Sequence, residues 1–209
     1  MNNAEARELL MSGAKGVSTW NQLRATRQIQ AMDIVFEFTP YFDQPLDLRG
    51  ADFGGCCLIG SNLSEADLTG AHLYQTNLEN VNLSRATFTG AHLVEANLSG
   101  ALIDGANFER ADLRQAQLCK AEGAARFSNA QMARIDMLAG NFNGCDFSAA
   151  ALVDARLDKV SAMGAHFVGT DLRRANIKHA ILDSPESMLN PATTRFDKAD
   201  LSQANLSST

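Results

Sequence analysis

The residues of this sequence best suited to chemistry are two aspartates and two histidines that recur at twenty-residue intervals: Asp52, His72, His92 and Asp112. Imidazoles and carboxylates are common ligands of divalent metals. They can share an ion only if the fold stacks them one above another. The alternative is a solvated ladder in which histidine replaces aspartate or asparagine. We favour this ladder, and expect no bound metal, because a flat and exposed column offers no concave site.

No other group of residues resembles a catalytic or cofactor site. The cysteines Cys56, Cys57, Cys119 and Cys145 lack the paired spacing of zinc or redox motifs, so we expect free thiols. The sequence contains no glycine-rich dinucleotide motif, phosphate loop or H-E-x-x-H motif. These observations predict a protein that is not an enzyme and uses no cofactor.

Composition narrows the class of protein further. Hydrophobic residues make up 45% of the chain, which is typical of a globular protein, but the apolar runs are too short to span a bilayer. A net charge of -6 argues against direct binding of nucleic acid. The N-terminus lacks the basic and apolar stretches of a signal peptide. We therefore expect a cytoplasmic protein with no membrane contact.

A five-residue repeat must position all of these side chains. A large apolar residue recurs at every fifth position from Leu48 to Leu118, with a small residue two places before it in most units. Ala66 to Gly70 (ADLTG) and Ala96 to Gly100 (ANLSG) show the pattern clearly. Neither a helix nor a flat strand has this period. The chain resembles the pentapeptide-repeat family, whose unit is A-[DN]-L-x-x.

The resemblance implies an all-β solenoid, a right-handed quadrilateral β-helix with twenty residues per coil. The central apolar residue and the small residue would both point inward. When the sequence is written in rows of twenty residues, the inward residues of one side line up in a column. The column continues past two irregular spacings if both of them are placed at the same corner of the coil. Its members are Leu48, Leu68, Phe88, Phe108, Phe127, Phe147, Phe167 and Phe196. This alignment predicts about eight coils, the last with three sides.

We divide the chain into an N-terminal cap at 1–45 and a β-helix at 46–209, with a loop insertion at 183–195. Ala4 to Met11 is rich in helix formers, and Val17, Trp20 and Leu23 follow at helical spacing. The segment 33–38 reads as a strand. Such a cap would cover the exposed edge of the first coil.

The predicted function is that of a scaffold mediating protein–protein interaction, with a protein partner that the sequence does not identify. The family resemblance supplies an alternative, a bacterial DNA mimic that inhibits or protects DNA topoisomerases such as gyrase and so confers quinolone or toxin resistance. The acidic surface of such a mimic would comprise Asp47, Asp52, Glu65, Asp67, Glu79, Glu95, Asp104, Glu109 and Asp112.

Charge counting disfavours the alternative. Residues 46–120 contain nine acids and five bases, a net charge of -4. Duplex DNA of comparable length, roughly 18 Å, carries around ten negative charges. The printed sequence also ends without the apolar C-terminal segment through which the topoisomerase-protecting relatives form dimers. We therefore expect a monomer or a weak dimer.

Overall fold

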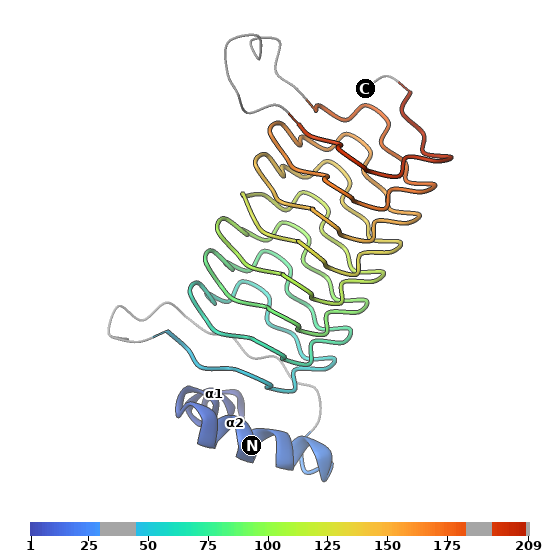
Figure 1. Cartoon of the computed structure of the whole chain (residues 1–209). Helices are drawn as coiled ribbons and strands as arrows, with labels where there is room; N and C mark the ends of the chain where they lie inside the picture. Colours follow the sequence, from blue (N-terminus) through green and yellow to red (C-terminus); the bar gives the residue numbers. More distant parts are fainter. Residues whose placement is uncertain (30–44, 183–193, 208–209) are drawn as a thin grey trace.

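The computed structural model describes residues 1–29, 45–182 and 194–207, and shows two helices followed by a stack of coils (Figure 1). Helix α1 spans Asn3–Met11 and helix α2 spans Ala14–Ala25. Both helices lie at the N-terminal end of the stack (Figure 1). The strand expected at 33–38 and most of the predicted loop at 183–195 fall outside the described residues.

Each coil contains four short extended segments, and each segment pairs with the coils above and below through a single parallel bridge. Bridged residues on consecutive coils are twenty positions apart over the regular part of the chain. The predicted β-helix is therefore confirmed, with one residue of each pentapeptide making the bridge.

The preference for aspartate or asparagine in the repeat has a local cause. The side chain of the bridging residue accepts a hydrogen bond from the backbone N–H two positions later, as in Asp67 with Thr69 and Asn97 with Ser99, both at 3.0 Å. The next residue has a positive φ, for example 65° at Gly70. This side-chain bond and the positive φ turn the chain at every corner.

The bridges define four sides, which we number in chain order. Side one is bridged through Asp47, Asp67, Thr87, Asn107, Arg126, Asp146, His166 and Arg195. Side two is bridged through Asp52, His72, His92, Asp112, Gln131, Ala151, Asp171 and Asp200. Side three is bridged through Cys57, Asn77, Asn97, Gln117, Asp136, Arg156, Asn176 and Asn205. Side four is bridged through Asn62, Asn82, Leu102, Glu122, Asn141, Ser161 and Ile181. Among the described residues, three sides thus reach eight coils and the fourth reaches seven, as the sequence predicts.

The predicted phenylalanine column is confirmed on side one. Six rings, from Phe88 to Phe196, stack face to face with centroids 4.8 to 5.1 Å apart. The column continues across both irregular spacings, because Phe127 stacks on Phe108 and Phe196 stacks on Phe167. Small residues such as Ala66 and Ala96 fill the remaining interior and are fully buried. A second large side chain at these positions would overpack the narrow tube.

The shortened corner after Gly123 is stabilised by local hydrogen bonds. Successive bridges lie at Glu122 and Arg126, four residues apart instead of five. Gly123 has φ 131°, and a Cβ there would meet the backbone nitrogen of Asp104 at 2.4 Å. The buried thiol of Cys145 accepts a hydrogen bond from the Ala125 N–H at 3.2 Å and donates one to the Gly123 carbonyl at 3.3 Å. Cys145 therefore satisfies backbone groups at the irregular corner.

The two helices cover the N-terminal edge of the first coil. The Trp20 indole N–H donates to the Asp52 carbonyl at 2.6 Å, and its ring lies 6.2 Å from the ring of Phe53. The Asn21 side chain accepts from the Asp52 N–H and donates to the Gly50 carbonyl. These contacts pair backbone groups that have no coil beneath them. No helix within the described ranges is long and apolar enough to cross a membrane.

Candidate functional site

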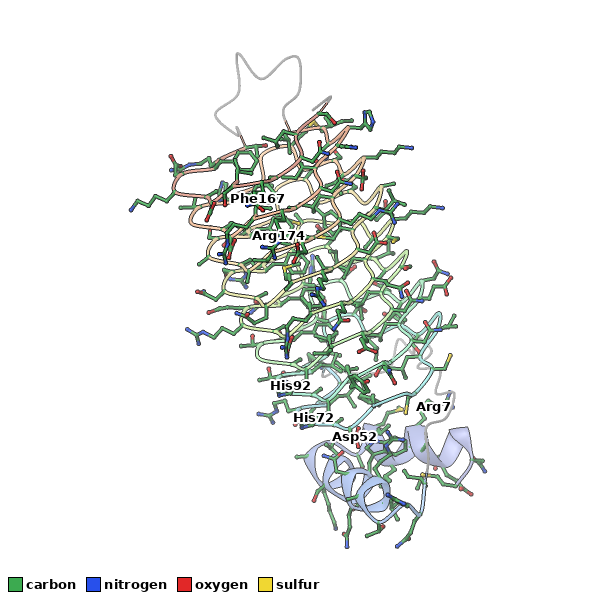
Figure 2. All side chains as sticks on the ribbon, turned by 90° about the vertical axis from the view of Figure 1, so that its right-hand side faces the viewer. Arg7, Asp52, His72, His92, Phe167 and Arg174 are labelled. Carbon is green, nitrogen blue, oxygen red and sulfur yellow. The ribbon has the colours of Figure 1, made fainter. Side chains whose placement is uncertain are left out.

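The four residues singled out by their spacing are brought together on side two. Parallel bridges join Asp52 to His72, His72 to His92, and His92 to Asp112. The two imidazole rings are exposed and stack with centroids 5.1 Å apart and an interplanar angle of 10°. Asp52, His72 and His92 follow one another up one side of the stack from the helices (Figure 2).

The stacked geometry does not suit a shared metal ion. The lone pair of an imidazole nitrogen lies in the plane of the ring, and zinc binds it at about 2.0 to 2.1 Å. Two parallel rings 5.1 Å apart direct their lone pairs side by side instead of toward one point. In the part of the chain that the structure describes, no group of three or more histidine, cysteine or acidic residues is placed to hold a metal.

The aspartates at the two ends of the column, Asp52 and Asp112, each form an ion pair with an arginine. Asp52 accepts a hydrogen bond from the Gly54 N–H at 2.9 Å and pairs with Arg24 of α2 at 3.5 Å. Asp112 receives two hydrogen bonds from the Arg114 guanidinium, at 2.8 and 2.7 Å. Burial opposes ionisation of Asp112, but the bonds from Arg114 and the proximity of His92 hold its pKa below the ordinary value. Both carboxylates therefore serve as ends of ion pairs.

Two residues not singled out by sequence reasoning complete this surface. Tyr74 and Val94 stand two positions after the histidines on the same coils, and Tyr74 is 49% exposed. We call His72, Tyr74, His92 and Val94 the side-two patch. Tyr74 is the sequence feature that could have predicted this patch. It is one of only two tyrosines in the sequence, and it stands at an outward position that elsewhere holds mostly small or polar residues.

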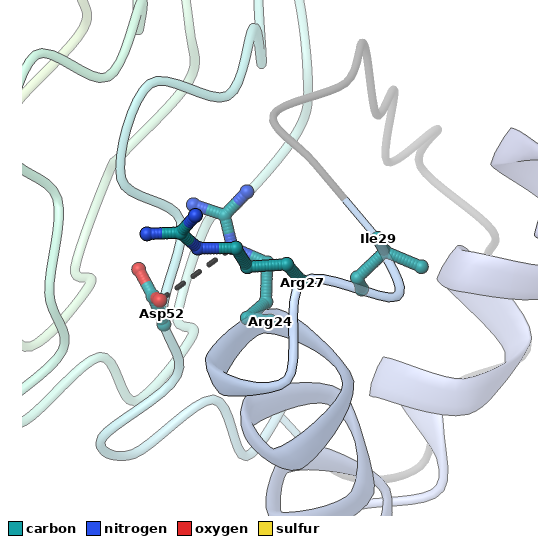
Figure 3. Close-up of a pocket in the computed structure, with 4 residues that line it drawn as sticks. All are labelled: Arg24, Arg27, Ile29 and Asp52. Carbon is teal, nitrogen blue, oxygen red and sulfur yellow. Dashed lines mark ion pairs between the residues drawn. The ribbon is translucent and has the colours of Figure 1, made fainter.

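Ion pairs border the side-two patch on the coils below and above it. The Arg24–Asp52 pair lies on the N-terminal side and the Arg114–Asp112 pair on the C-terminal side. Beside the first pair, Arg24, Arg27, Ile29 and Asp52 line a shallow pocket where the end of α2 meets the first coil (Figure 3). The patch is thus an aromatic and apolar centre between charged edges.

The nine acids proposed as a DNA-mimicking surface do not gather on one face. They are distributed over all four sides, with Asp47, Asp67 and Glu109 on side one, Asp52, Glu95 and Asp112 on side two, Glu79 on side three, and Glu65 and Asp104 on side four. Six of them form an ion pair with an arginine: Asp47, Asp52, Glu65, Asp67, Glu109 and Asp112. Their negative charge is therefore dispersed and partly neutralised.

The C-terminal half of side two is rich in arginine. Arg134, Arg173 and Arg174 follow Arg114 up this side. Arg174 makes two hydrogen bonds of 2.7 Å with Asp154, and Arg173 pairs with Asp171 at 2.7 Å. The pairing lowers the pKa values of both aspartates. Side two therefore ends in a network of ion pairs.

The comparison with protein families agrees with the five-residue repeat. The family description "Pentapeptide repeats" matches residues 47–85, 82–118 and 141–178, with eight copies of the repeat. Among curated proteins, no sequence matches the chain. Solved structures include HetL from the cyanobacterium Nostoc sp. strain PCC 7120, a protein involved in heterocyst differentiation regulation. It is 26% identical over 85% of this chain and 81% of its own, with a TM-score of 0.37.

Two other solved structures come from different settings. The plasmid-mediated fluoroquinolone resistance protein QnrB1 is 21% identical over 73% of this chain and 70% of its own, with a TM-score of 0.48. A pentapeptide repeat protein from the thylakoid lumen of Arabidopsis thaliana is 27% identical over 54% of this chain and 65% of its own, with a TM-score of 0.30. HetL and the Arabidopsis protein are both described as pentapeptide repeat proteins.

Proposed function

Because the chain belongs to the pentapeptide repeat family, we propose that it is a non-enzymatic scaffold that binds a protein partner through the side-two patch. The observation that carries the proposal is the grouping of exposed aromatic and imidazole rings on one flat side. His72, Tyr74 and His92 are all exposed on neighbouring coils. Aromatic residues are enriched at the centres of protein interfaces, where polar residues form the rim.

The rigidity of the scaffold supports the same proposal. Each patch residue is held by a backbone hydrogen bond to the preceding coil: the His72 N–H donates to the Ala51 carbonyl, and the Tyr74 carbonyl accepts from the Gly55 N–H. The two coils of the patch are joined in the same way, because the Leu73 N–H donates to the His92 carbonyl. The adjacent inward residues are fully buried. A partner would therefore meet side chains whose backbone is already ordered, which lowers the entropic cost of binding. Solenoids commonly act as extended binding surfaces in this way.

DNA mimicry receives less support from the structure than protein binding through the patch. A mimic requires a continuous negative surface, because duplex DNA carries about one charge per 1.7 Å. The acids here lie on all four sides, and most of them are paired with arginine. We therefore keep topoisomerase binding as the alternative and test it separately below.

Affinity capture from the native host tests the proposal directly. The patch variant carries Tyr74→Ala and Val94→Ala. Its matched control carries Glu79→Ala and Ser99→Ala, at the equivalent outward positions of side three on the same two coils. We expect a specific protein to be retained by the wild type and the control and lost by the patch variant. Retention of the same proteins by all three baits would contradict the assignment of the patch.

A further inference from the structure

The shallow pocket at the end of α2 holds an arginine whose charge is not balanced. The Arg24 side chain is 11% exposed, pairs with Asp52 and donates a hydrogen bond to the Gly54 carbonyl. Arg27 is exposed and lines the same pocket, and Figure 3 shows both arginine side chains extending toward the first coil. Over the residues that the structure describes, Arg27 has no ion-pair partner. Its guanidinium is therefore available to bind an anion.

The backbone of Arg27, rather than its side chain, ends helix α2. The Gln28 N–H donates to the Leu23 carbonyl at 2.9 Å, and the Arg27 N–H donates to the Arg24 carbonyl at 3.0 Å. These two bonds form a Schellman motif, in which the residue with a positive φ is usually glycine. Arg27 is that residue, with φ 56°. Ending the helix therefore does not account for an arginine at this position.

The pocket adjoins the side-two patch. Asp52 of the pocket is bridged to His72 of the patch. Gly54 stands one coil below Tyr74, at the equivalent outward position. A Cβ at Gly54 would lie 3.2 Å from Oδ1 of Asp52 and 3.6 Å from Nη2 of Arg24. The missing side chain at Gly54 therefore leaves the surface open between Tyr74 and the pocket.

The lining of the pocket suits a carboxylate better than a phosphate. The ion pair of Arg24 with Asp52 is neutral as a whole, so Arg27 supplies one net positive charge. A phosphate monoester carries about -1.5 to -2 at neutral pH and would place surplus negative charge beside Asp52. A carboxylate carries a single charge and accepts two parallel hydrogen bonds from a guanidinium. Ile29 is 9% exposed and adds an apolar wall for the methylene groups of an acidic side chain.

We propose that this pocket is an acid-binding subsite of the side-two surface. It receives an aspartate or glutamate side chain of the partner protein, which pairs with Arg27 while a neighbouring apolar or aromatic residue of the partner packs on Tyr74. The subsite rests on the proposed function, because it specifies the chemistry of the protein that docks on the side-two patch. Pairing of charges at the edge of the patch would fix the position of the partner along the rod.

Partner binding by two matched glycine variants tests the subsite. Arg27→Gly and Arg134→Gly each remove an exposed arginine with a positive φ, 56° and 60°, and Arg134 lies on side two beyond the patch. With the protein captured by the wild type, Arg27→Gly should weaken binding at least about tenfold, because a charge-assisted hydrogen bond is lost. Arg134→Gly should leave binding unchanged. Urea unfolding should show no loss of stability in either variant, because glycine is favoured at a positive φ.

A carbodiimide cross-link identifies the bound group. Arg27→Lys keeps the positive charge and introduces a primary amine. Carbodiimide joins such an amine to a carboxylate in direct contact through an amide bond, and itself takes up the water released. We expect Arg27→Lys to form an adduct with the partner, with the bond at an aspartate or glutamate of the partner by mass spectrometry. Arg134→Lys should give no such adduct.

The outcomes separate the subsite from the proposed function. Binding that Tyr74→Ala with Val94→Ala abolishes but Arg27→Gly retains would overturn the subsite and leave the proposed function intact. Equal weakening by Arg27→Gly and Arg134→Gly, or the absence of a partner adduct from Arg27→Lys, would overturn the subsite as well. A loss of binding that accompanies a loss of stability, and that Arg27→Lys does not restore, would show that Arg27 is structural. A wild type that captures no specific protein would overturn both proposals.

Discussion

The histidines of side two show how a repeat can gather chemically suggestive residues without building a site for a ligand. His72 and His92 are adjacent because the coil is twenty residues long, and their rings are parallel because every coil has the same shape. Because of that regularity, the lone pairs of the ring nitrogens run parallel and do not point toward one common metal position. The same pair of rings makes a flat, exposed surface beside Tyr74.

Metal addition should therefore leave the protein unchanged. We expect no shift in Tm with micromolar zinc or nickel, because ligands bound only to the folded state raise stability and no converging ligand set is present on side two. A thermal unfolding series with and without metal measures this. A rise in Tm that His72→Ala with His92→Ala abolishes would show that the column binds metal and would contradict our interpretation of it.

Cys145 gives a pH-dependent prediction. Burial raises the pKa of its thiol to about 12, whereas an unfolded thiol titrates near about 8.5. The folded state thus holds this proton more tightly. The resulting contribution to stability is complete below about pH 8.5 and is lost as the pH rises toward 12. The free energy of unfolding should fall by up to about 1.4 kcal/mol per pH unit in this window.

Cys145→Ser supplies the control for this prediction. Serine does not titrate here, and its hydroxyl can bond the same backbone groups of Ala125 and Gly123. Urea unfolding at several pH values between about 8 and 11 should give a shallower decline for Cys145→Ser than for the wild type. Equal slopes would mean that the thiol is not held protonated by burial.

The stacked coil is the element that determines stability. Phe127 is fully buried, stacked between Phe108 and Phe147, and in edge contact with Phe142. Phe127→Ala should lower the free energy of unfolding by about 3–5 kcal/mol, the range for truncating a buried aromatic residue. Val168→Ala, at a half-buried outward position on the same side, should cost much less in the same urea titration. Similar losses at both positions would refute the inward and outward assignments.

Periodicity explains which elements the sequence could predict. A fixed five-residue spacing assigns every inward and outward position, and the phenylalanine column locates both irregular corners. The bonds from Trp20 and Asn21 to the first coil come from non-repeating sequence, where no spacing relates the partners. The role of Cys145 could not be predicted either. Its thiol bonds backbone groups at a corner whose geometry follows from the shortened coil.

Prediction of the site was less complete than prediction of the fold. The register correctly stacked Asp52, His72, His92 and Asp112, since each lies twenty residues from the next. It could not show that Arg24 of α2 pairs with Asp52, or that Arg114 pairs with Asp112 two positions before it. Side-chain pairing depends on rotamers and on neighbours from other elements, which spacing alone does not specify.

At the scale of the whole molecule, charge distribution separates the two functions considered. We expect neither inhibition of gyrase supercoiling nor protection from a quinolone at low micromolar protein, because no side, over the residues that the structure describes, presents the charge density of DNA. The assay should include a variant with Asp47→Asn, Asp67→Asn and Glu109→Gln, three acids of side one. Inhibition by the wild type that this variant loses would favour the DNA-mimic alternative.

The most direct test of the scaffold proposal compares the four sides of one coil. Thr69, Tyr74, Glu79 and Ser84 occupy the same outward position on sides one to four of the second coil. A photoreactive phenylalanine analogue placed at each position in turn should cross-link a partner protein in the native host. Our account predicts a strong adduct from position 74 and weak or absent adducts from positions 69, 79 and 84. Equal yields from all four sides, or a partner adduct from another side alone, would contradict it.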